Sequence, residues 1–159
     1  MPRTMKGKLV SESAIHDQTV VVFPDDLNPL GTVFGGMIMA QSDRIAGVVA
    51  KRHSNRVCVT LGIDTVRFLA PAKHGDILVF KACINRVWNT SMEIGIKVFK
   101  EDFITGENAH ILSAYFTFVA LDEQFQPVKI PHVIPKTKEE KRRYREADQR
   151  RKTRLKQKY

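Results

Sequence analysis

The hydrophobic pattern of the chain is dominated by one long run of mostly apolar and small residues. It extends from Gly35 to His53, with a loop rich in glycine and proline before it and Ser54-Asn55 after it. This run predicts a helix that is apolar on most of its circumference, and helices of that kind are normally buried. One carboxylate, Asp43, lies in its middle, where it must be neutralised, paired or used in chemistry.

Five other segments have the alternating or β-branched composition of strands. Their predicted ranges are 17–23, 57–68, 77–88, 92–100 and 109–121. Short turns link the last four strands, which favours antiparallel pairing. The order predicts an α+β domain in which a five-stranded antiparallel sheet wraps one long central helix. Association with a second copy commonly covers the open edges of such a sheet, so at least a dimer is expected.

The net charge of +9 is concentrated at the C-terminal end of the chain. Residues 136–159 contain twelve Lys and Arg and four Asp and Glu, a net charge of +8, which leaves +1 for the rest. Three prolines between these regions predict an extended linker. The expected organisation is a domain over 1–126, a linker over 127–135 and a basic tail over 136–159. The tail has few apolar anchors and is expected to be a solvated helix or disordered.

Several functional classes are disfavoured by composition. No apolar segment is long enough to span a bilayer, and the N-terminal residues lack the apolar run of a signal peptide, so we expect a cytoplasmic protein without membrane insertion. Cys58 and Cys83 are expected to be buried thiols in a reducing compartment. The histidines are not spaced as metal ligands, so no metal is expected. Nucleic-acid binding by the tail is unlikely on sequence grounds, because only Tyr144 and Tyr159 are available there for stacking.

The start of the predicted helix is a second candidate for chemistry. Gly35 and Gly36 remove side chains where backbone N–H groups are unpaired, which favours an anion or oxyanion site; the alternative is that they only permit a tight turn. Gly36 and Asp43 are seven residues apart, about 10 Å along a helix axis. If both act on one carbon, the site must combine the helix start of one subunit with Asp43 of another. The alternative for Asp43 is an ion pair, for example with Arg67.

A set of motifs around these residues is similar to a known family. They are Asn28-x-x-Gly31-x-x-Phe34-Gly35-Gly36, Asp43 with Ala46-Gly47, Val59-Thr60, Asp64-x-Val66-x-Phe68-x-x-Pro71-x-x-x-Gly75-Asp76 and Asn89-Thr90-Ser91-Met92-Glu93. Together they resemble the hotdog-fold acyl-CoA thioesterases, specifically the brain acyl-CoA hydrolase group and its bacterial relatives.

The resemblance implies a hotdog fold and hydrolysis of fatty acyl-CoA to free fatty acid and CoA. No cofactor is implied, because coenzyme A is part of the substrate and product. Asp43 is implied to be the general base or the nucleophile, Asn28 to orient water or the thioester, and the N–H groups near Gly35 and Gly36 to polarise the carbonyl. Active sites in this family lie at subunit interfaces, often in a trimer of dimers.

Substrate contacts are less strongly indicated. CoA carries phosphates, for which Arg86, Lys73 and the tail are candidate cationic partners. By family position Thr60, Thr90 and Ser91 are expected along the pantetheine channel; ordinary strand and turn hydrogen bonding is the alternative. A non-catalytic hotdog module that binds acyl-CoA remains an alternative function. A hotdog dehydratase is disfavoured because no histidine lies near the helix start.

Overall fold

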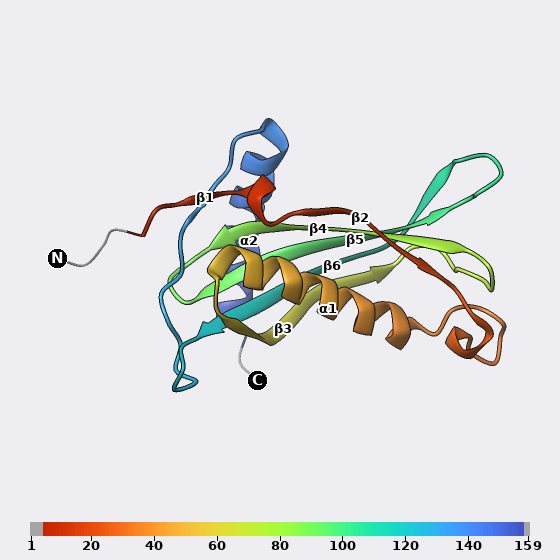
Figure 1. Ribbon diagram of the computed structural model, residues 1–159, viewed down its shortest axis with the longest axis horizontal. Helices are drawn as coiled ribbons and strands as arrows, with labels where there is room; N and C mark the ends of the chain where they lie inside the picture. Colours follow the sequence, from red (N-terminus) through yellow and green to blue (C-terminus); the bar gives the residue numbers. More distant parts are fainter. Residues whose placement is uncertain (1–4, 158–159) are drawn as a thin grey trace.

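The computed structural model describes residues 5–157, which form a five-stranded antiparallel sheet with one long helix on each face (Figure 1). The helices are α1 (Gly35–Ser54) and α2 (Lys138–Lys156), with short 3-10 turns η1 (Val10–Glu12) and η2 (Pro24–Asp26). In spatial order the strands are β2 (Ile15–Val21), β4 (Ile77–Val87), β5 (Ser91–Glu101), β6 (Asn108–Leu121) and β3 (Val57–Phe68). Two short strands, β1 (Lys8–Leu9) and β7 (Val133–Ile134), pair in parallel outside this sheet.

The predicted α+β architecture, with one long helix wrapped by a five-stranded antiparallel sheet, is confirmed. The first strand is the least accurate prediction: it begins at Ile15 instead of Asp17 and ends at Val21. It starts earlier because its pairing with β4 continues across a bulge between Ile15 and Gln18. The β1–β7 pair was not predicted, because two-residue strands carry no recognisable periodicity.

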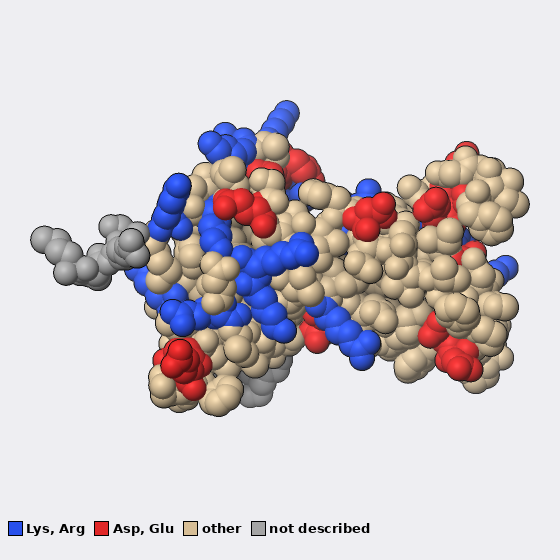
Figure 2. Space-filling view, viewed as in Figure 1, with Lys and Arg blue, Asp and Glu red and all other residues tan. Residues whose placement is uncertain are grey.

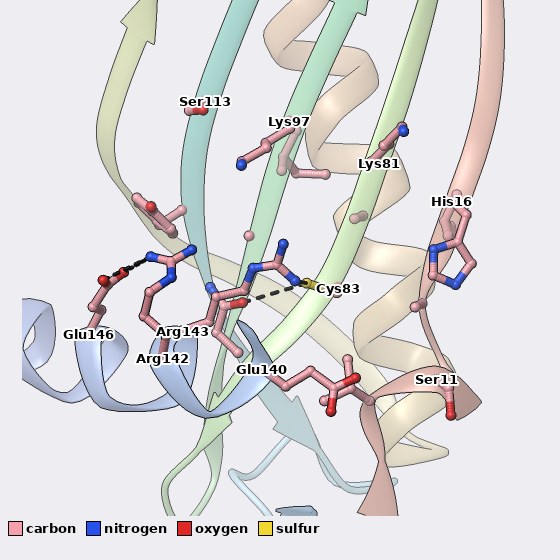
Figure 3. Close-up of a pocket in the computed structure, with 18 of the residues that line it drawn as sticks. Ser11, His16, Lys81, Cys83, Lys97, Ser113, Glu140, Arg142, Arg143 and Glu146 are labelled. Atoms are coloured by element: carbon pink, nitrogen blue, oxygen red, sulfur yellow. Dashed lines mark hydrogen bonds and ion pairs between the residues drawn. The ribbon is translucent and has the colours of Figure 1, made fainter. Parts of the chain in front are cut away.

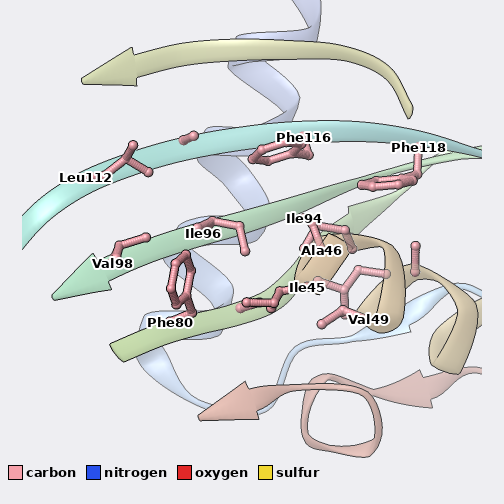
Figure 4. Packing of buried hydrophobic residues seen from close by; sticks show 14 of the residues in the cluster. Ile45, Ala46, Val49, Phe80, Ile94, Ile96, Val98, Leu112, Phe116 and Phe118 are labelled. Atoms are coloured by element: carbon pink, nitrogen blue, oxygen red, sulfur yellow. The ribbon is translucent and has the colours of Figure 1, made fainter. Parts of the chain in front are cut away.

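The hydrophobic core lies between α1 and the sheet (Figure 4). Alternate residues of the central strands point toward α1, and each such row is almost fully buried. On β5 these are Ile94, Ile96 and Val98. The helix contributes Ile45, Ala46 and Val49 to the same core (Figure 4). The alternating residues of the strands and the apolar residues of α1 therefore form one apolar layer. Burying each aliphatic side chain there stabilises the folded state by about 1.5–3 kcal/mol.

Within one chain α1 is not buried all round, in contrast to the prediction. Its outer side exposes Arg44, Val48, Lys51 and Arg52. Figure 2 shows basic side chains gathered on this face around the C-terminal part of α1, where cations favourably oppose the helix dipole. The sequence predicts a nearly neutral domain and a basic tail. The structure adds a local basic cluster on the domain, formed by Arg44, Lys51 and Arg52 of α1.

Strand β3 forms one edge of the sheet and exposes an apolar surface. Exposed large hydrophobic residues on and next to it are Val57, Val59, Leu61, Ile63, Val66, Phe68 and Leu69. Within the described residues its only strand partner is β6, so its outer backbone edge is unpaired. An unpaired, apolar edge favours pairing with another chain.

Helix α2 packs on the face of the sheet opposite α1. The helical alternative predicted for the tail is confirmed over 138–156, but the helix is docked instead of solvated. Its N-terminus has a capping box, in which Thr137 accepts from the Glu140 N–H and Glu140 accepts from the Thr137 N–H. Its contacts with the sheet use Tyr144, on which Arg86 stacks, and the ion pair between Arg150 and Glu93, while Ala147 is buried.

Candidate active site

The middle of α1 is joined to the edge strand β3 by one side-chain hydrogen bond. The Thr60 hydroxyl donates to Asp43 Oδ1 over 2.6 Å. Thr60 is in register with Phe118 of β6, which in turn is in register with Met92 of β5. Phe118 and Met92 belong to the core under α1, so this row of side chains faces the helix. The strand thus presents Thr60 to Asp43.

Asp43 is half-buried and forms no ion pair within residues 5–157. The ion-pair alternative with Arg67 is therefore wrong for the single chain. Arg67 is in register with Ser113, whose side chain lines a cleft on the α2 side of the sheet. A carboxylate oriented by one hydroxyl, and not neutralised by a cation, retains lone pairs for a water molecule or an acyl carbon.

The start of α1 presents backbone donors. The Met37 N–H donates to the Phe34 carbonyl over 3.0 Å, whereas the N–H groups of Gly35 and Gly36 find no partner in the described part of the chain. Both glycines lie close to the far ends of phenylalanine rings, which would have to move if a side chain were added. A Cβ on Gly36 would lie 2.4 Å from the Phe34 ring, and one on Gly35 would lie 3.0 Å from the Phe68 ring. This end of the helix can therefore donate two hydrogen bonds to an anionic oxygen.

Asn28 organises the loop that leads into this helix start. Its Oδ1 accepts from the N–H groups of Leu30 (3.0 Å) and Thr32 (3.2 Å), and its Nδ2 donates to the Thr32 hydroxyl (2.9 Å). The side chain is thus engaged within its own loop. This arrangement gives Asn28 a positioning role in the chain; the contact with water or thioester implied by the family resemblance stays a prediction.

Asp43 and the helix start are separated along one continuous helix. Because α1 runs unbroken from Gly35 to Ser54, the rise from Gly36 to Asp43 is about 10 Å. One chain therefore does not bring the carboxylate and the glycine N–H groups to the same atom.

The other predicted contact residues lie elsewhere. The Arg86 guanidinium stacks on the Tyr144 ring (4.1 Å) and pairs with Asp148 (3.7 Å), so its charge is used to hold α2. Ser91 accepts a long hydrogen bond from Arg151 of the same helix (3.4 Å). Thr90 lies in the preceding turn. Within one chain the sheet separates Arg86 and Ser91 from Asp43, so the structure does not unite them in one site.

An apolar cleft next to the helix start was not predicted from the sequence. It has a volume of about 420 Å³ and is lined by Thr32, Val33, Gly35, Ile38, Phe68, Leu69, Ala70, Pro71 and Ala72. The lining comes from the loop before α1 with the start of that helix, and from the end of β3 with the loop after it. These segments are distant in sequence, so no local pattern indicates the cleft. Its position beside Gly35 provides an apolar surface next to the unpaired N–H groups.

Comparison with known proteins identifies the family. The sequence model of the thioesterase superfamily matches residues 30–106. The acyl-CoA thioester hydrolase YkhA of Bacillus subtilis (strain 168) is 40% identical over 137 residues, which covers 86% of this chain and 79% of that protein. The chain belongs to the thioesterase superfamily. It is an acyl-CoA thioesterase with the hotdog fold.

Solved structures of acyl-CoA thioesterases match almost the whole chain of this thioesterase. An apo-hexameric acyl-CoA thioesterase superposes with a TM-score of 0.92 at 38% identity, covering 96% of this chain and 97% of that one. An acyl-CoA hydrolase from Staphylococcus aureus, crystallised with butyryl coenzyme A, coenzyme A and coenzyme A disulfide, gives a TM-score of 0.88 at 37% identity. It covers 93% of this chain, and 90% of its own chain is matched. The similarity therefore includes α2 as well as the hotdog core.

Two further observations bear on the chemistry of this thioesterase. Among the described residues, no three His, Cys, Asp or Glu side chains are grouped so that they could hold a metal ion. None of the helices within residues 5–157 is sufficiently long and apolar to cross a membrane.

Proposed function

We propose that this thioesterase hydrolyses fatty acyl-CoA to free fatty acid and CoA at sites shared between two copies of the chain. Asp43 is the general base or the nucleophile, and the observation that carries this assignment is its hydrogen bond from Thr60 (2.6 Å) without a neutralising cation. The Staphylococcus aureus acyl-CoA hydrolase supports it indirectly: its solved variants replace an aspartate, an asparagine or a threonine with alanine.

In this proposal the thioester carbonyl binds at the start of α1. The free N–H groups of Gly35 and Gly36 donate to the carbonyl oxygen and stabilise the negative charge that develops there. Asp43 of a neighbouring copy either removes a proton from the attacking water or attacks the carbon and forms an anhydride. In the first route the C–S bond then breaks, and the CoA thiolate takes up the proton that Asp43 removed from water. In the second route the C–S bond breaks as the anhydride forms, and a water molecule then hydrolyses the anhydride, which releases the fatty acid, regenerates the Asp43 carboxylate and supplies the proton for the CoA thiolate. The apolar cleft beside Gly35 accommodates the first part of the acyl chain.

The composite site follows from the separation of the two groups on α1. The apolar, unpaired edge of β3 is the surface best suited to a second copy, because a strand added there buries both its backbone edge and its exposed side chains. That edge also carries Thr60, so the partner would lie close to Asp43. We therefore propose a homo-oligomer, a dimer at least; the hexameric assembly of a structural relative supports a trimer of dimers.

The other residues predicted from the sequence have supporting roles in this reaction. Thr60 acts through Asp43, and Asn28 acts through the loop that precedes Gly35. Roles of Arg86, Thr90 and Ser91 in binding CoA require that a neighbouring copy bring its substrate to their face of the sheet. No cofactor is needed for this chemistry. A cytoplasmic location remains the prediction from the free thiols of Cys58 and Cys83.

The test is a hydrolysis assay with a panel of acyl-CoA chain lengths, from acetyl-CoA to palmitoyl-CoA, that measures the CoA thiol released. Asp43→Asn keeps the size of the side chain and the contact with Thr60, and should lower kcat by about 10²–10⁴-fold. Asp17→Asn, which removes an exposed carboxylate on β2, is the matched control and should leave turnover unchanged. Unchanged turnover of Asp43→Asn would refute the assignment. Saturable acyl-CoA binding without product would favour the non-catalytic module.

A further inference from the structure

Two lysines lie directly opposite each other on the α2 side of the sheet. Lys81 of β4 is in register with Lys97 of β5, and both side chains are exposed. Like charges in directly opposed positions of an antiparallel pair are destabilising. Among residues 5–157 neither lysine has an ion-pair partner; Lys81 lies 5.3 Å from the centre of the Phe99 ring. The pair therefore lacks a counter-ion among the described residues, and Lys81 is stabilised instead by a cation–π contact with Phe99.

The lysine pair forms part of the wall of a cleft of about 560 Å³ (Figure 3). The floor of the cleft is the outer face of β4, β5 and β6, and its sides are η1 and the N-terminal turns of α2. Figure 3 shows Arg143 rising from α2 toward Cys83, below Lys81 and Lys97. This volume falls in the range of roughly 300–1,000 Å³ that is usual for small-molecule sites. The cleft is thus large enough for a small organic ligand.

Two acidic groups line the cleft, and each is held by contacts within the chain. Glu140 accepts from the backbone N–H groups of Lys136 (2.6 Å) and Thr137 (3.1 Å), and Glu146 is paired with Arg142 (2.7 Å). Glu140 keeps its negative charge, because backbone N–H groups are neutral donors. The lining nevertheless has four Lys and Arg side chains against these two carboxylates, so the lysines are not fully compensated.

The thiol on the floor adds no negative charge either. Burial raises the pKa of Cys83, although the nearby Arg143 guanidinium (3.5 Å) opposes this shift, so the thiol stays protonated at neutral pH. The floor of the cleft consequently carries the positive charge of the two lysines, whereas Arg143 at its side is also paired with Glu139 (3.4 Å).

We infer that this outer cleft binds a small phosphate-bearing anion through Lys81, Lys97 and Arg143. Ammonium and guanidinium groups form short, charge-assisted hydrogen bonds with phosphate oxygens, and a bound anion removes the repulsion between the two lysines. A cleft enclosed on two sides by η1 and α2 suits a small ligand better than a polymer.

The inferred site is distinct from the proposed catalytic site of the same chain, because the sheet lies between the lysine pair and Asp43. Its test reads binding directly and does not depend on hydrolysis. Phosphates could reach the cleft from two sources: a free phosphorylated metabolite, or the CoA moiety of a substrate held by a neighbouring copy.

The probe is pyrophosphate, titrated calorimetrically into the full-length protein at near-physiological salt. We expect saturable binding that weakens at least about tenfold in Lys81→Gln/Lys97→Gln. Lys129→Gln/Lys141→Gln removes the same charge from exposed positions outside the cleft and should bind like the wild type. Because the lysines repel each other, the cleft variant should have a Tm equal to or above that of the wild type in the absence of ligand.

The inference is overturned if no saturable binding is observed, or if both double variants weaken it equally, because diffuse charge would then explain it. It is also overturned if a duplex oligonucleotide binds through the lysine pair and pyrophosphate does not. Two supporting outcomes distinguish the sources. An unchanged KM for acyl-CoA in the cleft variant identifies a free phosphate ligand, whereas a raised KM identifies the phosphates of CoA.

Discussion

Thr60 on the edge strand β3 donates a hydrogen bond of 2.6 Å to Asp43 in the middle of α1. The contact joins the middle of α1 to β3, and it orients one carboxylate oxygen. Because β3 is also the edge available to a second copy, the hydroxyl fixes the carboxylate at the place where the proposed composite site forms.

Thr60→Val removes this hydrogen bond while preserving the shape of the side chain. A hydrogen bond to a charged group contributes about 1.5–3 kcal/mol, so kcat should fall about 10–100-fold with little change in KM. Thr60→Ser retains the hydroxyl and should keep most of the activity. A Val variant with wild-type kcat would show that Asp43 does not depend on this contact for its orientation.

The composite site predicts complementation between two inactive variants. Asp43→Asn removes the carboxylate. Gly36→Val adds a branched side chain at a position where a Cβ alone would lie 2.4 Å from the Phe34 ring. In a mixed pair, one site contains the intact helix start of the first chain and the intact Asp43 of the second. Mixed pairs isolated through two affinity tags after co-expression should therefore have about half of wild-type activity, because each mixed pair has one intact site out of two.

Each variant expressed alone should remain inactive, and mixing two preparations of the same variant provides the control. If the purified mixed oligomers have no more activity than either parent, Asp43 and the helix start do not act in one intersubunit site. The assay separates this result from misfolding, because tagged pairs are isolated only when both chains assemble.

The sheet and α1 could be predicted from the sequence because their patterns are local. The range of β3 was predicted to the residue, and α1 extends to Ser54, only one residue beyond the predicted end. Alternation and helical period depend on which residues face a single core, and that information is contained in each segment. Asp43 could be identified as a candidate from local sequence for the same reason, since it is a carboxylate within an otherwise apolar helix.

The docking of α2 could not be predicted in this way, because its partners are distant in sequence and polar. Arg150 stacks on Tyr115 (3.6 Å) and binds the carboxylate of Glu93. In the sequence an arginine in a basic tail is typical of a solvated surface. The same limitation affects Arg86, a candidate phosphate partner in the sequence, whose guanidinium is stacked on Tyr144 of α2.

The Arg150–Glu93 ion pair should be essential for stability. Glu93 is fully buried and accepts from Arg150 Nη2 (2.6 Å), Arg150 Nε (3.2 Å) and Asn85 Nδ2 (2.9 Å). Arg150→Met leaves a buried carboxylate without its cation, which should lower the free energy of unfolding by about 3–5 kcal/mol. Urea denaturation followed by circular dichroism measures this change.

Two further variants sharpen that test. Adding Glu93→Gln to Arg150→Met removes the uncompensated charge and should recover a large part of the lost stability. Arg145→Met changes an exposed arginine on the other side of α2 and should leave the urea midpoint unchanged. If Arg150→Met is as stable as Arg145→Met, the ion pair does not contribute to the docking of α2.

His53, at the end of α1, should make stability depend on pH. Its ring is fully buried and its Nε2–H donates to the Pro131 carbonyl (2.8 Å), while Nδ1 is buried without a partner among the described residues. Burial lowers the pKa of His53; the Pro131 hydrogen bond opposes this shift, and the charge of Lys8 adds to it.

The folded state therefore releases the His53 proton more readily than the unfolded state. As the pH falls below about 6.5, the unfolded chain gains a proton that the folded chain does not, and the free energy of unfolding should decrease by at most about 1.4 kcal/mol per pH unit. His53→Gln keeps a donor for Pro131 and should flatten this dependence between about pH 7.5 and pH 5.5, whereas His74→Gln, at an exposed position, should not. An equally steep dependence in His53→Gln would assign it to other groups.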